Sequence, residues 1–155
     1  MTDSKKNAVT PPWAAAPTVK TKNGIQRSVT ALLDELAPER VLKRAERLEG
    51  SVEQHRTPSG CVLQATSAAV SVSWYPDARD GAPLGELHIV VWNGTVTRLG
   101  TPRVAKGATV VSELVVRPVD PPDDACAWRD PDGTTFSTAG LVTKCLALLE
   151  AQAQR

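Results

Sequence analysis

Two histidines and three cysteines are the residues of this chain whose side chains could carry out nucleophilic catalysis. His55 precedes Cys61 by a few residues, and a histidine beside a cysteine can act as the base that activates the thiol. Such a pair also needs an acid to orient the imidazole and a donor for the oxyanion, and no motif positions either group. Residues 57–60 between them have the composition of a turn. The spacing favours a surface histidine beside a structural cysteine.

Other signatures of catalysis, phosphate binding or metal binding are missing. The chain has no glycine-rich phosphate loop, no HExxH, no Gly-x-Ser-x-Gly elbow and no cluster of Cys and His. Residues 130–133 (Asp-Pro-Asp-Gly) begin like a calcium loop, but Leu141 occupies position twelve, where a bidentate glutamate is required. We therefore expect no catalytic residue, no cofactor and no metal site. Catalysis by carboxylates alone is the alternative.

A tight turn is predicted at Asn93 and Gly94, which separate two arms rich in β-forming residues. This pair favours a two-residue type I′ turn, because both central residues need a positive φ and Asn and Gly tolerate it best. The turn would place Val91 opposite Val96 in a hairpin. An antiparallel sheet around this hairpin is the predicted centre of the molecule.

One face of the predicted hairpin carries His88 and Trp92, and His88 would lie opposite Leu99. If helices cover this face, His88 is a rim or core residue, which is the usual position of a lone histidine. If the face is open, Trp92, His88 and Tyr75 would form a shallow platform for a ligand or peptide. The core interpretation is the simpler one, because a chain with one Phe and one Tyr has few aromatic residues to fill its interior.

The charge balance argues against strong attraction to nucleic acid or membranes, since 18 basic residues face 17 acidic ones. The N-terminal 27 residues nevertheless carry five basic side chains and only one acidic side chain. If this segment folded toward the loop at residues 98–107, the shared basic surface could contact phosphates in a salt-sensitive way. The candidate nucleic-acid contacts are Lys20, Lys22, Arg27, Arg103 and Lys106. No recognition helix or zinc module supports them, so a solubilising tail is the simpler interpretation.

Residues 1–24 are predicted to be a disordered basic tail, because they are rich in Lys, Thr, Ala and Pro and show no apolar period. Trp13 is either a loosely docked residue of this tail or a short anchor for a partner. Residues 25–155 would form one domain. Three widely spaced cysteines predict reduced, buried thiols in a cytoplasmic protein, and no apolar stretch is long enough to span a membrane.

Helical spacing appears at both ends of the predicted domain. Ser28 is a good N-cap for a first helix, and Pro38 predicts a break before a second short helix that ends at Gly50. Ser137 can cap a closing helix, with Phe136 packing onto Leu141. The apolar stripes comprise Val29, Leu32, Leu33 and Leu36 in the first helix, and Leu141, Cys145, Leu148 and Leu149 in the last.

The middle of the chain is predicted to be β. Residues 61–66 form one apolar run, and residues 70–75 alternate apolar and polar side chains, as in a sheet with one dry face. Residues 110–116 form a further strand, and residues 125–136 form a last hairpin around the Asp-Pro-Asp-Gly turn. If the strand at 110–116 lies at the sheet edge, it could pair with a second copy of the chain.

Together these elements predict a single α+β domain. A bent or paired N-terminal helix and a C-terminal helix would pack on one face of an antiparallel sheet of five or six strands. The function expected first is a small cytoplasmic, non-enzymatic binding or adaptor protein that recognises a protein or peptide through a sheet face, an edge strand or a helix groove. The alternatives are a small-molecule-binding protein or small enzyme with a pocket between sheet and helices, and a nucleic-acid-associated protein.

Overall fold

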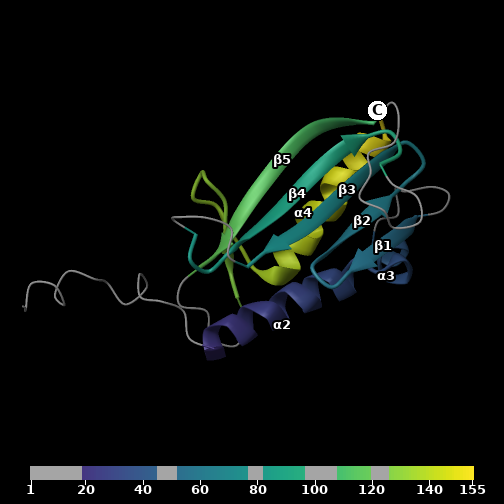
Figure 1. Cartoon of the computed structure of the whole chain (residues 1–155). Helices are drawn as coiled ribbons and strands as arrows, with labels where there is room; N and C mark the ends of the chain where they lie inside the picture. Colours follow the sequence, from purple (N-terminus) through teal and green to yellow (C-terminus); the bar gives the residue numbers. More distant parts are fainter. Residues whose placement is uncertain (1–18, 45–51, 77–81, 97–107, 120–125) are drawn as a thin grey trace, which may run out of the picture.

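The computed structural model describes residues 19–44, 52–76, 82–96, 108–119 and 126–155, with the side chains of 42–44 excepted. One antiparallel sheet of seven strands forms in chain order, so each strand pairs with the next (Figure 1). The predicted α+β class with a single sheet is confirmed, with slightly more strands than expected. The strands are β1 (Glu53–Thr57), β2 (Gly60–Gln64), β3 (Ala68–Tyr75), β4 (Glu86–Asn93), β5 (Thr109–Pro118), β6 (Trp128–Arg129) and β7 (Thr135–Phe136).

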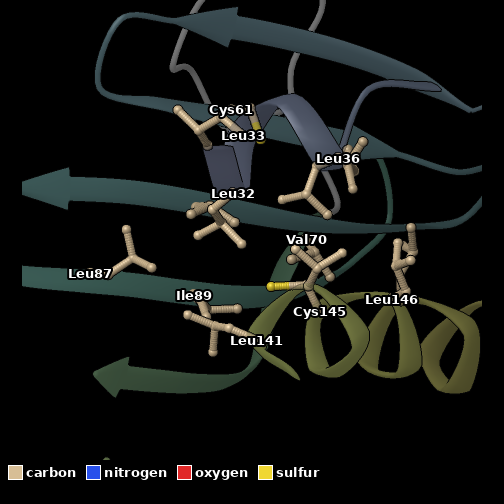
Figure 2. Packing of buried hydrophobic residues seen from close by; sticks show 14 of the residues in the cluster. Leu32, Leu33, Leu36, Cys61, Val70, Leu87, Ile89, Leu141, Cys145 and Leu146 are labelled. Carbon is tan, nitrogen blue, oxygen red and sulfur yellow. The ribbon is translucent and has the colours of Figure 1, made fainter. Parts of the chain in front are cut away.

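Helices α2 (Val19–Glu35) and α4 (Thr138–Ala153) cover one face of this sheet, and α3 (Pro38–Arg44) follows α2 (Figure 1). α4 packs on β3 and β4 and also against α2. Leucines of both helices meet aliphatic side chains of the central strands in the layer between them (Figure 2). Trp74 and Trp128 extend this layer with an edge-to-face contact at 5.8 Å between ring centroids. Burial of large apolar side chains here is the main source of stability.

The first helix begins earlier than predicted. α2 already includes Val19, so residues 19–24 are helical instead of belonging to a tail, and Ser28 lies inside the helix. Ile25 is 2% exposed, which explains why the helix extends toward the N-terminus past Ser28. The Ser28 hydroxyl accepts a hydrogen bond from the backbone N–H of Cys126 at 3.1 Å, so it joins distant segments instead of capping a helix. Residues 1–18 lie outside the described residues.

The predicted break at Pro38 is confirmed, because α3 begins at that residue. The predicted helix end at Gly50 falls outside the described residues. β1 was not predicted, since its sequence is wholly polar. Gln54 in β1 donates hydrogen bonds to the carbonyl oxygens of Leu33 and Leu36, at 3.3 and 3.0 Å. Leu33 lies in the last turn of α2 and Leu36 directly follows it, so β1 anchors that helix end.

The predicted hairpin at Asn93 and Gly94 is wrong. β4 pairs with β5 instead of with the residues that follow the turn, and Val91 lies opposite Ser112 rather than Val96. Gly94 does adopt a positive φ of 103°, as the turn prediction required. Its backbone N–H, however, donates to the carbonyl oxygen of Ser67 at 2.8 Å. The chain therefore turns toward the connection between β2 and β3.

A buried glutamine explains this departure. The Gln64 amide nitrogen donates to the carbonyl oxygen of Gly94 at 3.0 Å, and the Gln64 amide oxygen accepts from the N–H of Val96 at 3.0 Å. The same nitrogen also bonds the carbonyl oxygens of Ala65 and Ala68. These bonds supply the backbone partners that a second hairpin arm would have supplied.

The predicted turn at residues 130–133 and the predicted Ser137 cap are confirmed. The Asp130 carboxylate accepts from the N–H groups of Asp132 and Thr134, both at 2.9 Å, and so holds the turn between β6 and β7. Ser137 caps α4 by accepting from the N–H of Gly140 at 2.9 Å. The buried stripe of α4 is wider than predicted and excludes Leu148, which is half-buried; it comprises Leu141, Val142, Cys145, Leu146, Leu149 and Gln152.

Candidate functional site

The face of the sheet opposite α2 and α4 is the candidate site. Cross-strand pairing decides which residues share it, because paired residues point to the same side of a sheet. His88 pairs with Ser73 on β3 and with Val115 on β5, and none of the three belongs to the buried core. We call this surface the open face. Its central residues are Val62, Ser71, Ser73, Tyr75, Glu86, His88, Val90, Trp92, Glu113, Val115 and Arg117.

Two of the three predicted platform residues lie in contact on the open face. The rings of Tyr75 and His88 are 4.7 Å apart between centroids and are tilted by 59°. Tyr75 is 46% exposed, and the His88 side chain is 21% exposed. Position 88 faces Val115 rather than the predicted Leu99, yet its side chain lies on the uncovered side. The structure therefore brings the two rings together on a surface instead of in a core.

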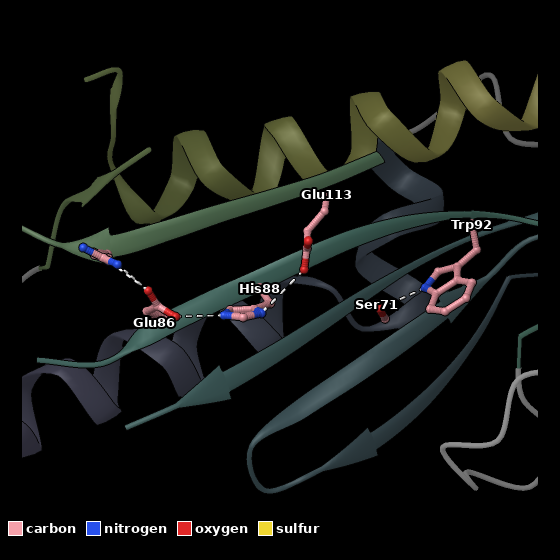
Figure 3. A network of polar contacts seen from close by, with 6 residues as sticks. Ser71, Glu86, His88, Trp92 and Glu113 are labelled. Atoms are coloured by element: carbon pink, nitrogen blue, oxygen red, sulfur yellow. Dashed lines mark hydrogen bonds and ion pairs between the residues drawn. The ribbon is translucent and has the colours of Figure 1, made fainter. Parts of the chain in front are cut away.

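Trp92, the third platform residue, lies farther along β4 on the same face. Its indole N–H donates to the Ser71 hydroxyl of the neighbouring strand at 3.0 Å (Figure 3). This hydrogen bond satisfies the one polar group of the indole, and the half-buried ring then lies along the sheet. Trp74 on β3, by contrast, points to the helix-covered side. The side chains of Trp74 and Trp92 therefore lie on opposite faces of the sheet.

A charged network runs beside the two contacting rings. Arg117 donates from Nε and Nη2 to one carboxylate oxygen of Glu86, at 2.9 and 2.7 Å. The other Glu86 oxygen lies 3.1 Å from Nε2 of His88, and Nδ1 of His88 lies 3.6 Å from the Glu113 carboxylate (Figure 3). The Glu86 side chain is 4% exposed, whereas those of Arg117 and Glu113 are about half exposed, at 48% and 52%. Only the outer groups of the network can meet a ligand.

The network orients the His88 ring between two carboxylates. A carboxylate lies near each ring nitrogen, so the imidazole is held between β4 and β5. Only the contact with Glu86 is within hydrogen-bond distance, and the contact with Glu113 is a longer charge interaction. Ser73 pairs with His88 across the strands, so its hydroxyl lies on the same face as the imidazole.

The other candidate pair, His55 and Cys61, is separated by the sheet. His55 pairs with Val62, whereas Cys61 pairs with Arg56, so the two side chains point to opposite faces. Burial raises the pKa of the Cys61 thiol from 9.0 to about 12, which disfavours the nucleophilic thiolate. His55 lies instead 3.6 Å from the Glu53 carboxylate. This agrees with the structural interpretation of both residues.

The basic residues proposed for nucleic acid are only partly within the described residues. Lys20, Lys22 and Arg27 lie exposed on α2. Lys20 and Arg27 are seven residues apart and share a side of the helix, whereas Lys22 points roughly 140–160° away from them. Trp13, Arg103 and Lys106 fall outside the described residues.

Glu86 is the residue of the site that sequence reasoning missed. An acidic residue in a strand is usually solvated, whereas the structure buries the Glu86 carboxylate against Arg117. Alternation along β4 places Glu86 with His88, but nothing local identifies Arg117 as its partner. A charge in a strand of mostly apolar residues was the available signal, because such a charge needs a counter-ion when buried.

In the ranges that the structure describes, no helix is long and apolar enough to cross a membrane. Within the same ranges, no group of three His, Cys, Asp or Glu side chains is arranged to hold a metal ion. Comparison of the chain with models of protein families, with curated proteins and with solved structures found no match.

Proposed function

We propose that this chain is a small, non-enzymatic cytoplasmic binding protein that holds a peptide segment of a partner protein on its open face. The observation that carries the proposal is the contact of Tyr75 with His88 on a sheet surface that α2 and α4 leave uncovered. Aromatic side chains that are partly exposed beside oriented polar groups are typical of recognition surfaces. The buried free cysteines are typical of a reducing compartment.

The open face also indicates the chemistry of the partner. Along β4 from Glu86 to Trp92 it extends over roughly 20 Å, enough for a short extended peptide or about three helical turns. Tyr75 and Trp92 offer aromatic surface, and the half-exposed carboxylate of Glu113 offers an anionic contact between them. We therefore expect a segment with apolar side chains and at least one Arg or Lys. An exposed ion pair of this kind would add selectivity more than affinity.

A library of random peptides displayed on phage, selected on the purified full chain, tests this proposal. We expect enrichment of peptides that combine apolar residues with Arg or Lys. The affinity of a selected synthetic peptide should fall roughly tenfold or more in Tyr75→Ala, since a contact aromatic is often an energetic centre of an interface.

Val19→Ala is the matched control. Val19 is an apolar residue of α2 that is 75% exposed, so its truncation removes apolar surface away from the open face. The variant should bind the selected peptide like the unaltered chain. No enrichment, or a selected peptide whose affinity is the same in Tyr75→Ala and the unaltered chain, would contradict the proposal.

A further inference from the structure

The outer edge of β5 is left open beside the site. β5 pairs with β4 along Thr109–Val116 on one side, but β6 covers its other side only at Arg117 and Pro118. Within the described ranges, no strand lies beside residues 109–116 on that outer side (Figure 1). An uncovered edge of this length is a template for pairing with another strand, because its backbone groups have no protein partner.

The pairing with β6 shows which backbone groups point outward. The N–H of Val119 donates to the carbonyl oxygen of Ala127 at 2.8 Å, so Val119 directs its backbone groups toward β6. Backbone groups alternate in direction along a strand, and Arg117, Val115 and Glu113 therefore point the same way. Beyond β6, the N–H and C=O groups of Val115 and Glu113 form an outward row that faces no strand among the described residues.

A bulge defines the other limit of the usable edge. Val91 pairs with Ser112 and Trp92 pairs with Val110, so Val111 is the extra residue of β5. A bulge bends the strand and interrupts regular pairing. The regular, uncovered part of β5 is therefore Ser112–Val116, between the bulge and β6. Val110 and Val111 beside it are 56% and 44% exposed, which adds apolar surface at this end of the edge.

We propose that this edge pairs with the same edge of a second copy, giving an antiparallel dimer with its two-fold axis at Leu114. In this register Leu114 faces its own copy, and Glu113 faces the partner's Val115. Glu113 and Val115 both belong to the open face, so each face of one sheet continues into the same face of the other. Both copies then satisfy the outward N–H and C=O groups of residues 113 and 115.

Neighbouring registers are less suitable. A two-fold axis at Glu113 would set two carboxylates directly opposite each other, which is destabilising. An axis at Val115 would require Arg117 to pair with the second copy, although Arg117 already pairs with Arg129 of β6. The axis at Leu114 avoids both conflicts and places the bulge where the partner's β6 begins. The edge of one copy is therefore complementary to the same edge of a second copy, which is why we assign a second copy as its partner.

Sedimentation velocity of the full chain over roughly 1 µM to 1 mM, the range of weak association, tests the dimer. We expect a concentration-dependent species of twice the 16.5 kDa mass of the chain. Glu113→Pro should weaken dimerisation roughly tenfold or more, because it removes an outward donor from each copy while leaving the pairing with β4 intact. Glu113→Gln keeps this N–H and should dimerise like the unaltered chain. Circular dichroism checks that each variant is folded.

Disulfide cross-linking tests the register without depending on proline. Residues opposite each other in a non-hydrogen-bonded antiparallel pair have Cα atoms about 4.5 Å apart, which a disulfide can span. Leu114→Cys should therefore cross-link under mild oxidation much faster than Glu113→Cys. In the dimer, residue 113 of one copy and residue 113 of the other are diagonal neighbours, roughly 7–8 Å apart. The buried native cysteines give little background.

Three results would overturn the dimer: a monomer at all concentrations, equal dimerisation of Glu113→Pro and Glu113→Gln, or cross-linking of Leu114→Cys no faster than that of Glu113→Cys. The inference goes beyond the proposed function and does not depend on it. A monomer that still binds selected peptides through Tyr75 would refute the dimer and leave peptide binding supported.

Discussion

The two faces of the sheet consist of alternating residues of the same strands, yet they differ in almost every physical property. On β4, Leu87 and Ile89 are fully buried under α2 and α4, whereas the alternating residues His88 and Val90 are half-buried on the open face. The covered face is dominated by aliphatic side chains, which need no hydrogen-bond partners. The open face contains charges, hydroxyls and rings that need partners. Stability therefore belongs mainly to the covered face, and recognition can belong to the open face.

The largest expected difference between the faces comes from truncating neighbouring aliphatic residues. Leu87→Ala should lower the free energy of unfolding by about 3 kcal/mol, because it removes buried surface and leaves a cavity under the helices. Val90→Ala on the open face should cost less than about 1 kcal/mol. Urea denaturation of both variants measures the contrast. Similar losses would mean that something covers the open face as tightly as the helices cover the other.

A second difference in stability concerns the buried carboxylate of Glu86, which lies at one end of the open face. Arg117→Met should cost about 1–2 kcal/mol, because the nearly buried carboxylate of Glu86 loses its closest cation, although Arg117 itself is half exposed. Glu113→Gln, which alters an exposed carboxylate of the same network, should change stability by less than about 0.5 kcal/mol. Urea denaturation of the double variant Glu86→Gln with Arg117→Met should recover part of the loss. A double variant less stable than Arg117→Met would contradict the assigned pairing.

The smallest expected effect involves a thiol under the covered face. Burial raises the pKa of Cys145 from 9.0 to about 12, so above pH 9 the unfolded chain releases this proton while the folded chain keeps it. The unfolded state then binds fewer protons, and stability falls as the pH rises. Between pH 8 and pH 10, the unaltered chain should lose about 1 kcal/mol more than Cys145→Ala. Equal losses, measured by urea denaturation at both pH values, would show that this thiol ionises without unfolding.

Local sequence was sufficient wherever one short segment contains both the signal and its partner. Ser137 and the backbone that it caps are three residues apart, and Asp130 bonds residues within its own turn. Pro38 starts a helix because its ring sets its own φ. The alternation of apolar and polar residues in β3 predicted a sheet with one buried face and one solvent-facing face. The two helices do cover only one face of the sheet. The α+β class followed from these local patterns.

Local reasoning was insufficient where a distant residue competed for the same backbone. Asn93 and Gly94 carry a strong turn signal, but β5 supplied the pairing for β4, and Gln64 bound the residues after the turn. The polar β1 became a strand through pairing with β2. Ser28 resembled a cap but serves as an acceptor for Cys126. Each partner is well separated in sequence, so no short window contained it.

The sequence by itself determined which residues alternate, which cap and which break helices, because these properties arise from the chemistry and φ preferences of each residue and its near neighbours. Only the tertiary structure decided which strand lies beside which, and therefore that Glu86 meets Arg117, that Tyr75 meets His88, and that the outer side of β5 is an edge. The physical reason is that strand pairing joins residues far apart in the chain. Its outcome depends on how all the segments bury their surfaces together.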